Sequence, residues 1–197
     1  MPAPTLTIDG RRARRERGRQ AVIDAVVDLL QEGSVPPRPD EVTARAGVSE
    51  ATLFRYFDTL AELQHAAMVS YLERSAPLFE VPGLGEGPLE ARAHRLAAAR
   101  VELYEVVGPV ARLARARAFD EPDLARLVHD VRSRLAEQVG RHFEPELDSL
   151  SPTARRDREV LIVAATSFES WDIHVDLGRN PAQIRRSWKR AVIDLCR

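Results

Sequence analysis

Four side chains that could bind nucleic acid are closely spaced in the stretch AGVSEATLFRYF, residues 46–57. The guanidinium of Arg55 can donate paired hydrogen bonds to guanine or to a phosphate, and the hydroxyl of Thr52 can bind a base edge. Ser49 and Tyr56 carry hydroxyl groups that suit phosphate oxygens. Groups of these types on one face of a helix are typical of a surface that reads the major groove of DNA.

The helical repeat predicts which side chains of this stretch point outward. At about 100° per residue, a helix that turns Leu53 and Phe57 toward the core turns Ala51 and Arg55 directly away from it. A residue as small as Ala51 would let the helix approach DNA closely. The flanks and the edge of the outward face are expected to hold Thr52, Phe54 and Tyr56.

The outward residues divide into two expected roles. Base contacts, which read the sequence, are expected first from Thr52 and Arg55. Phosphate contacts, which only set the position of the protein, are expected from Arg45, Ser49 and Tyr56.

Local signals place the stretch in a helix-turn-helix. Pro39 suits a first helical position, and the helix that it begins should end at Gly47, which permits a left-handed turn. Ser49 is a good N-cap for the next helix. Thr59 and Glu62 form the pattern of a capping box, which should open a longer helix that ends near residue 75.

The rest of the chain is also predicted to be helical. Of its 197 residues 44% are hydrophobic, which is enough for a core, and no alternating strand pattern is present. A segment rich in proline and glycine at 77–88 marks the boundary between two regions. Helices are expected near residues 17–33, 39–47, 49–57, 59–75, 89–107, 110–118, 122–143, 153–177 and 181–196, with caps at Asp120, Ser151 and Asn180.

Composition limits the class of protein. The single cysteine, Cys196, excludes an internal disulfide framework and fits a reducing cytoplasm. The longest apolar run, 160–165, is far too short to span a bilayer, so we expect a soluble protein. The formal net charge of −1 is uninformative, but residues 10–19 carry six arginines and one glutamate. This basic arm, 1–16, could lie along DNA phosphates or a minor groove, or could be a solvated tail.

The pattern AGVSxxTLxxYFxxxxxL resembles the DNA-binding domain of the TetR (tetracycline repressor) family of transcriptional regulators. The resemblance covers residues 17–72 by motif and the rest only by helical layout. It is carried by Ala46, Gly47, Val48, Ser49, Thr52, Leu53, Tyr56, Phe57 and Leu63. Four positions depart from the usual pattern, one of which is Arg38, where members usually have a threonine that caps the second helix. Members often have glycine at the position of Ala51, tyrosine at that of Phe54 and lysine at that of Leu60.

The resemblance implies an all-α protein in which a three-helix DNA-binding domain, 17–75, is joined to a larger helical domain, 76–197. It further implies a homodimer that binds a palindromic operator in double-stranded DNA, and a repressor that a small-molecule effector releases. No cofactor is implied. A constitutive DNA-binding protein without a ligand, and a helical enzyme, are the alternatives. The sequence shows no catalytic set of residues, and its histidines show no metal-ligand spacing.

In the larger domain we predict an effector pocket around Arg100, which falls within an apolar stripe. Such an arginine either lays its methylenes on the core and keeps its head in water, or anchors a ligand inside a pocket. In the second case it needs a partner such as an anionic ligand or Glu169. Aromatic side chains could line this pocket or belong to the ordinary core. The predicted pocket residues are Leu96, Arg100, Leu103, Tyr104, Phe119, Phe168 and Glu169.

The last two predicted helices, 153–177 and 181–196, are the candidates for a dimer interface. Small residues would allow a partner helix to approach closely, and large apolar residues would offer area for burial. The same residues could instead pack within one subunit. The predicted interface residues are Ala164, Ser167, Trp171, Ile184 and Trp188.

Overall fold

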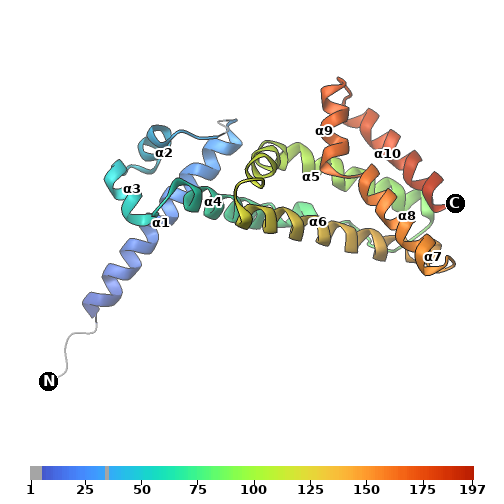
Figure 1. Cartoon of the computed structure of the whole chain (residues 1–197), viewed down its shortest axis with the longest axis horizontal. Helices are drawn as coiled ribbons and strands as arrows, with labels where there is room; N and C mark the ends of the chain where they lie inside the picture. The colour runs from blue at the N-terminus through green and yellow to red at the C-terminus, as the bar shows by residue number, and fades with distance from the viewer. Residues whose placement is uncertain (1–5, 34–35) are drawn as a thin grey trace.

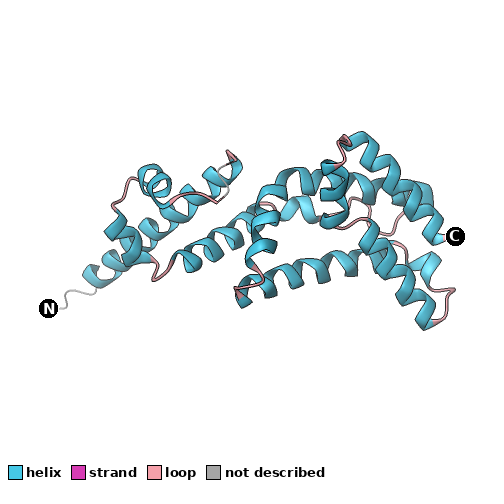
Figure 2. Cartoon of the chain, turned by 45° about the horizontal axis from the view of Figure 1, so that its top comes forward, coloured by secondary structure: helices cyan, strands magenta, loops and turns pink. Residues whose placement is uncertain are grey.

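The computed structural model describes residues 6–33 and 36–197, apart from the side chains of residues 6–9 and 11. The described residues form helices joined by loops, with no strand among them, which confirms the predicted all-α fold (Figure 2). No helix in the described ranges is both long enough and apolar enough to cross a membrane. Residues 1–5 of the predicted arm lie outside the described residues.

The N-terminal unit contains the predicted helix-turn-helix. Its first helix packs against the second and against the long helix that leads into the rest of the chain (Figure 1). The helices of this unit are α1 (Leu6–Gln31), α2 (Pro39–Ala46), α3 (Glu50–Tyr56) and α4 (Leu60–Arg74).

Helix α1 is longer than the sequence predicts, because it includes most of the expected basic arm. Its helical course is continuous from Leu6 to Gln31, whereas the predicted helix starts at residue 17. Arginine, alanine and glutamate are strong helix formers, which favours this continuation. Gly18 lies where the hydroxyl of Tyr56 approaches the backbone too closely for a Cβ atom. A glycine at this position therefore lets α1 pack against α3.

The larger unit consists of two long helices and four shorter ones, preceded by a short 3-10 helix (Figure 1). Helix α10 packs against both α5 and α8, and α6 also lies against these two helices. The elements are η1 (Ala76–Phe79), α5 (Leu89–Arg117), α6 (Pro122–His142), α7 (Glu144–Leu147), α8 (Pro152–Ala165), α9 (Phe168–Asp176) and α10 (Pro181–Cys196).

Helix α5 continues through Pro109, where the sequence predicts a break between two helices. Proline removes one backbone donor, and its ring clashes with the carbonyl four residues earlier and with the Cβ and N–H of the preceding residue. That preceding residue is Gly108, which has no Cβ. The missing Cβ removes part of the clash, so the helix can pass through the proline.

The helix predicted at 153–177 is divided into α8 and α9, which corrects that expectation. Thr166 donates its hydroxyl hydrogen to the carbonyl of Ile162 at 2.8 Å, and Ser170 donates to the carbonyl of Ala165 at 2.9 Å. Ser167 then caps α9 by accepting from the backbone N–H of Ser170 at 3.1 Å. These hydroxyl groups take over backbone partners and end the first helix.

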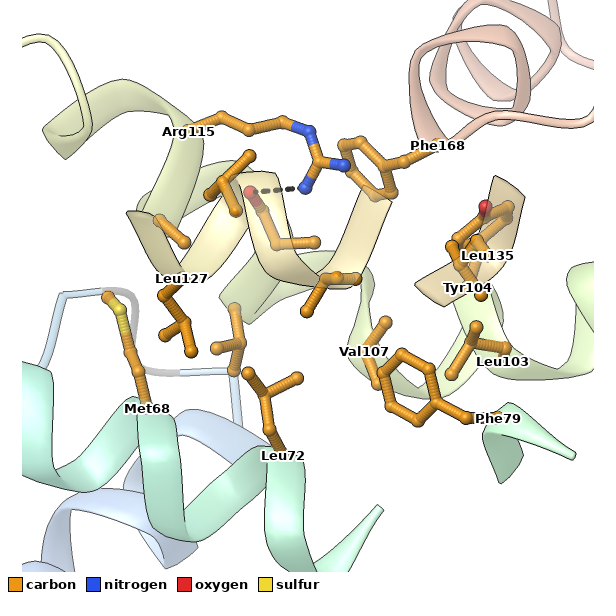
Figure 3. A pocket seen from close by; sticks show the side chains of 15 residues that line it. Met68, Leu72, Phe79, Leu103, Tyr104, Val107, Arg115, Leu127, Leu135 and Phe168 are labelled. Atoms are coloured by element: carbon orange, nitrogen blue, oxygen red, sulfur yellow. Dashed lines mark hydrogen bonds between the residues drawn. The ribbon is translucent and has the colours of Figure 1, made fainter. Parts of the chain in front are cut away.

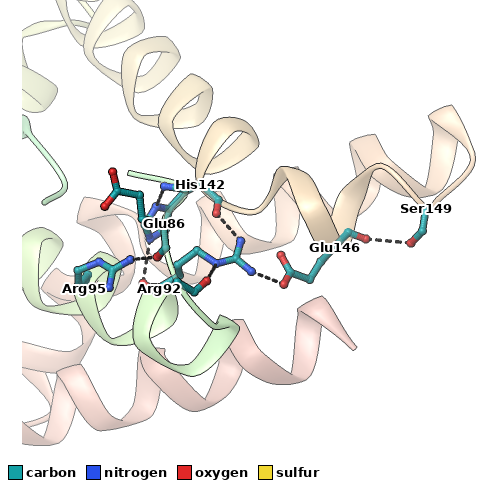
Figure 4. A network of polar contacts seen from close by, with 8 residues as sticks. Glu86, Arg92, Arg95, His142, Glu146 and Ser149 are labelled. Atoms are coloured by element: carbon teal, nitrogen blue, oxygen red, sulfur yellow. Dashed lines mark hydrogen bonds and ion pairs between the residues drawn. The ribbon is translucent and has the colours of Figure 1, made fainter. Parts of the chain in front are cut away.

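A polar network fixes the far end of the larger unit. The buried Arg92 of α5 donates to the carbonyl of His142 at 2.7 Å and forms an ion pair with Glu146 of α7 (Figure 4). The guanidinium also lies 5.7 Å from the ring centroid of Phe143. Because these partners lie on both sides of the bend between α6 and α7, Arg92 holds the bend against α5.

Candidate functional site

Helix α3 is held by two residues that are completely buried. Leu53 and Phe57 are each 0% exposed in the core of the N-terminal unit, as the helical rotation predicts. On the opposite face, Ala51, Phe54 and Arg55 are exposed, and Phe54 keeps 43% of its surface in solvent. The outward face of α3 therefore presents a small, an aromatic and a cationic side chain.

The turn before α3 has the geometry that the sequence predicts. Gly47 has φ 66° and ψ 32°, a left-handed conformation that favours glycine, and its N–H donates to the carbonyl of Thr43. Ser49 caps α3 by accepting from the N–H of Thr52 at 3.2 Å, and its hydroxyl lies 3.0 Å from that of Thr52. The two hydroxyl groups are therefore paired with each other at the exposed start of α3.

Helix α4 begins at the predicted cap. Thr59 accepts from the N–H of Glu62 at 3.1 Å, which is the expected half of the capping box. The carboxylate of Glu62 accepts instead from the N–H of Asp58 at 2.9 Å, one residue further back than predicted. Both bonds fix the entry of the chain into α4 directly after α3.

Two of the predicted phosphate-binding residues have partners within the protein. The guanidinium of Arg45 donates to both carboxylate oxygens of Glu32, at 2.9 and 2.7 Å. This hydrogen bonding, more than the charge of the arginine, lowers the pKa of Glu32. Tyr56 is only partly exposed, and its hydroxyl lies against Gly18. Arg45 and Tyr56 would therefore have to change partners or surroundings to bind a phosphate.

Arginines of the predicted basic arm lie on the face of α1 beside α3, a placement that the sequence interpretation did not give. Arg15 donates to the carbonyl of Arg55 at 3.3 Å, and the guanidinium of Arg19 lies 4.6 Å from the ring centroid of Phe57. Arg12, Arg15 and Arg19, with Tyr56, line one surface notch, which the carboxylates Glu16, Asp58 and Glu62 also line. Arg19 forms an ion pair with Glu62 at 3.5 Å, which leaves Arg12 and Arg15 as the cations available to a phosphate. The spacing of these arginines, three and then four residues, indicates one helical face and could have revealed this surface.

A narrow apolar cavity lies between the long helices of the larger unit and α4 (Figure 3). Its volume is about 50 Å³. Figure 3 shows Met68 and Leu72 of α4 on one side of it, opposite side chains of α5 and α6. Of the predicted pocket residues, Leu103, Tyr104 and Phe168 line this cavity. The contribution of α4 was not predicted, because its apolar side chains are equally suited to a closed core.

A second cavity, of about 310 Å³, adjoins the first. It is lined by two of the predicted charged residues, Arg100 and Glu169, together with Arg115 and Arg132. Two predicted pocket residues do not line either cavity. Leu96 is fully buried in the core around Phe143, and Phe119 is 93% exposed, beyond the end of α5.

Arg100 is a buried cation, which excludes the expectation that its head reaches water. It is 1% exposed, and one guanidinium nitrogen donates to the carbonyl of Leu135 at 3.1 Å. The other terminal nitrogen, Nη1, is buried and has no hydrogen-bond partner. Burial lowers the pKa of Arg100, although arginine remains protonated in proteins.

Glu169 is paired with arginines other than Arg100. Arg115 donates to its carboxylate at 2.9 Å, and Arg132 forms a second ion pair with it. Partial burial alone would raise the pKa of Glu169, but the hydrogen bonds from the two arginines lower it to about 2. Nearby, burial raises the pKa of Tyr104 to about 12, and its hydroxyl donates to the carbonyl of Thr166 at 3.2 Å.

The predicted dimer residues separate into two groups. Trp171, Ile184 and Trp188 are 7%, 1% and 2% exposed and pack inside one subunit, so they cannot form an interface with a partner. Ala164 is exposed and Ser167 is partly exposed. Ile184 and Trp188 are buried because α5 and α8 already cover the apolar face of α10.

Apolar residues that the sequence interpretation did not select are exposed near Ala164. Val160 and Leu161 of α8 keep 60% and 50% of their surfaces in solvent. They belong to the apolar run 160–165, which is longer than one buried face of a surface helix requires. The additional apolar residues of this run could have predicted an exposed apolar face on the helix.

The structure is thus a helix-turn-helix unit joined by one helix to a larger helical unit with an internal cavity. Structural neighbours across most of the chain are TetR-family transcriptional regulators, and the chain has their fold. No protein-family profile matches the sequence, and no curated protein matches it.

Three solved structures illustrate the similarity. A TetR-family regulator from Streptomyces coelicolor has a TM-score of 0.65 and 24% identity, over 91% of this chain and 79% of the other. A putative TetR-family regulator from Mesorhizobium loti has a TM-score of 0.67 and 17% identity, over 92% and 96%. The multidrug-binding protein EbrR, complexed with imidazole, has a TM-score of 0.60 and 20% identity, over 88% and 93%.

Proposed function

We propose that the protein is a sequence-specific DNA-binding transcriptional regulator, and that α3 enters the major groove. The observation that carries this proposal is the burial of Leu53 and Phe57, which turns Ala51 and Arg55 outward after a tight turn. A cationic side chain on an exposed helix face can donate paired hydrogen bonds to guanine. Thr52 supplies a second polar group for base contacts.

The basic face of α1 extends the proposed DNA surface. Arg12 and Arg15 lie beside the C-terminal end of α3, where they would meet phosphates on the flank of the groove. Ser49 and Tyr56 are proposed to add contacts to the backbone. Arg45 would contribute after exchanging Glu32 for a phosphate.

A homodimer would let two copies of α3 read the two halves of a palindromic operator. The exposed apolar residues Val160 and Leu161, together with Ala164 and Ser167, form the proposed contact on α8. Sedimentation equilibrium tests this interface. We expect a dimer for the parent and a monomer for Leu161→Glu, with Phe119→Glu as the control at another exposed apolar residue. A monomeric parent would contradict the proposal.

A small-molecule effector is proposed to bind the cavity and to act as an inducer of a repressor. Met68 and Leu72 of α4 line the apolar part of the cavity, and α4 starts directly after α3. A ligand that displaces α4 would therefore change the position of α3. EbrR, a multidrug-binding protein of similar fold that was solved in complex with imidazole, supports the binding of a small molecule by this fold.

The test of DNA binding starts from genomic fragments that the purified protein retains, which are sequenced to find an enriched site. Fluorescence anisotropy on that site then compares the parent with Arg55→Ala at one salt concentration. We expect a loss of about 1–3 kcal/mol in binding free energy, which is the value of a good base contact. Arg190→Ala is the matched control, because Arg190 is an arginine of α10 whose side chain is 86% exposed. Equal affinity of Arg55→Ala and the parent would exclude α3 as the reading helix.

A further inference from the structure

The two cavities of the larger unit are compartments of one site, because the same side chains line both. The shared residues are Tyr104, Arg115, Leu135 and Phe168. The guanidinium of Arg115 lies 4.2 Å from the ring centroid of Phe168, at the junction of the compartments (Figure 3). A single ligand could therefore occupy the apolar compartment with one end and the second compartment with the other.

The second compartment has an excess of positive charge. Three arginines line it, Arg100, Arg115 and Arg132, and Glu169 is the carboxylate among its lining residues. Three positive charges and one negative charge leave a formal charge of +2 on the walls of a partly closed cavity. Charges in such a setting act more strongly on a ligand than charges in bulk water do.

Arg100 is the lining cation whose charge the protein leaves uncompensated. Glu169 is bound by Arg115 and Arg132, whereas the hydrogen bond of Arg100 goes to the neutral carbonyl of Leu135. Its Nη1 is buried without a partner. A buried charge of this kind is unfavourable unless an opposite charge pairs with it. The arrangement therefore favours an occupant that carries a negative group.

We propose that the site binds amphipathic organic carboxylates, with the carboxylate paired to Arg100 and the apolar part directed between α4, α5 and α6. This assignment rests on the proposed function, since it specifies the chemical class of the effector. The lining of the first compartment is almost entirely aliphatic and aromatic, which suits an apolar group. Its volume of about 50 Å³ means that α4 must move away from α5 and α6 to admit a hydrocarbon chain or a ring. The volume of the second, about 310 Å³, lies at the lower end of the range of roughly 300–1,000 Å³ for small-molecule pockets.

Calorimetric titration of the full chain without DNA tests the ligand class directly. The probes are decanoate and naphthalene-2-carboxylate, each compared with its neutral counterpart, decan-1-ol and 2-naphthylmethanol. We expect at least one carboxylate to bind about tenfold or more tightly than its alcohol, because only the carboxylate can pair with Arg100. Absence of such a preference in both pairs overturns the assignment, and this comparison needs no substitution in the protein.

The substitution Arg100→Met tests the role of the arginine. It should lower carboxylate affinity by about tenfold or more and leave alcohol affinity unchanged. Arg126→Met, at an arginine of α6 whose side chain is 71% exposed, is the control and should bind as the parent does. The urea midpoint of Arg100→Met should equal or exceed that of the parent, because an apolar side chain replaces an unpaired buried charge. Parent-like carboxylate binding by Arg100→Met overturns the role of Arg100.

Failure of this inference and failure of the proposed function give different results. A protein that retains specific DNA fragments but shows no carboxylate preference is a DNA-binding regulator with another class of effector or with none, so the inference alone is overturned. A protein that binds carboxylates through Arg100 but retains no specific DNA supports the assigned ligand class and excludes the proposed regulator.

Discussion

His142 is a buried side chain whose two ring nitrogens have fixed and opposite hydrogen-bonding roles. The backbone N–H of Gly85 donates to Nδ1 at 2.9 Å, so Nδ1 must be unprotonated. Nε2 lies 2.9 Å from the carbonyl oxygen of Arg92 and therefore carries the proton of the neutral ring. Protonation of Nδ1 would break the first bond and add a charge near Arg92 and Arg95 (Figure 4).

This environment predicts that the protein loses stability as the pH falls from 7 to 5. Burial lowers the pKa of His142, and the nearby arginines add to this effect against the hydrogen bond to the Arg92 carbonyl. The stability that neutral His142 contributes is therefore fully present above about pH 6.5, the usual pKa of histidine in the unfolded chain. It is lost as the pH falls from there toward the lower folded pKa, at up to about 1.4 kcal/mol per pH unit. Urea unfolding at several pH values measures the free energy of unfolding as a function of pH. This free energy should depend less steeply on pH for His142→Gln than for the parent. Burial also lowers the pKa of His174, which both proteins keep. Parallel curves of the free energy of unfolding against pH for the parent and the variant would contradict the prediction.

At the residue scale, the sequence predicted what the helical repeat determines. Leu53 and Phe57 are buried because residues four apart share a face, which can be read without a tertiary structure. The partners of Arg100 could not be read in this way. They depend on which side chains of α6 and α9 meet α5, and Glu169, the expected partner, is bound by other arginines.

Helix α5 depends on the absence of a side chain at Gly108. A Cβ atom at this position would lie 2.9 Å from Cη2 and 3.1 Å from Cζ3 of Trp171. Trp171 is 7% exposed and is held in the core, so its ring cannot move away freely. The added Cβ would also approach the ring of Pro109.

We therefore expect Gly108→Ala to lower the free energy of unfolding by up to about 2 kcal/mol. Overpacking of a core costs about 1–3 kcal/mol, and the gain in helix propensity of about 1 kcal/mol offsets part of it. Gly140→Ala in α6 is the matched control. There the nearest atom is the carboxylate oxygen of Glu159 at 3.2 Å, at the end of a flexible side chain, so the propensity gain should be retained. Urea denaturation of both variants measures the difference, and equal stabilisation by the two substitutions would contradict the steric argument.

At the element scale, most of the side-chain caps were predictable from the sequence. Ser151 and Asn180 cap α8 and α10 as expected, because a side-chain cap needs only residues within the same turn. Asp120 does not cap α6, which begins at Pro122 after Glu121. The continuity of α5 was not predicted, because it depends on the missing Cβ of Gly108 before Pro109. The division at Thr166 was not predicted, because it depends on competition between backbone and side-chain partners.

The whole molecule is elongated, with the reading helix in one unit and the cavity in the other (Figure 1). Helix α4 connects them and belongs to both. Its start follows α3 directly, and its residues Met68 and Leu72 line the cavity. Near its end the hydroxyl of Tyr71 donates to the carbonyl of Val106 in α5 at 2.8 Å. This bond ties the helix to the wall of the larger unit.

If α4 transmits the state of the cavity, binding of ligand and binding of DNA must be coupled by the same factor in both directions. We expect the best carboxylate from the panel to bind the protein–DNA complex about 5–150 times more weakly than the free protein, the usual range for such coupling. DNA affinity at saturating ligand should fall by that same factor. Calorimetry of the two forms and anisotropy with and without ligand supply the four affinities. Tyr71→Phe, which removes the bond to α5, should reduce the coupling, whereas the affinity of the free protein for ligand and its affinity for DNA should each change little. An identical ligand affinity for free and DNA-bound parent protein would exclude the switch.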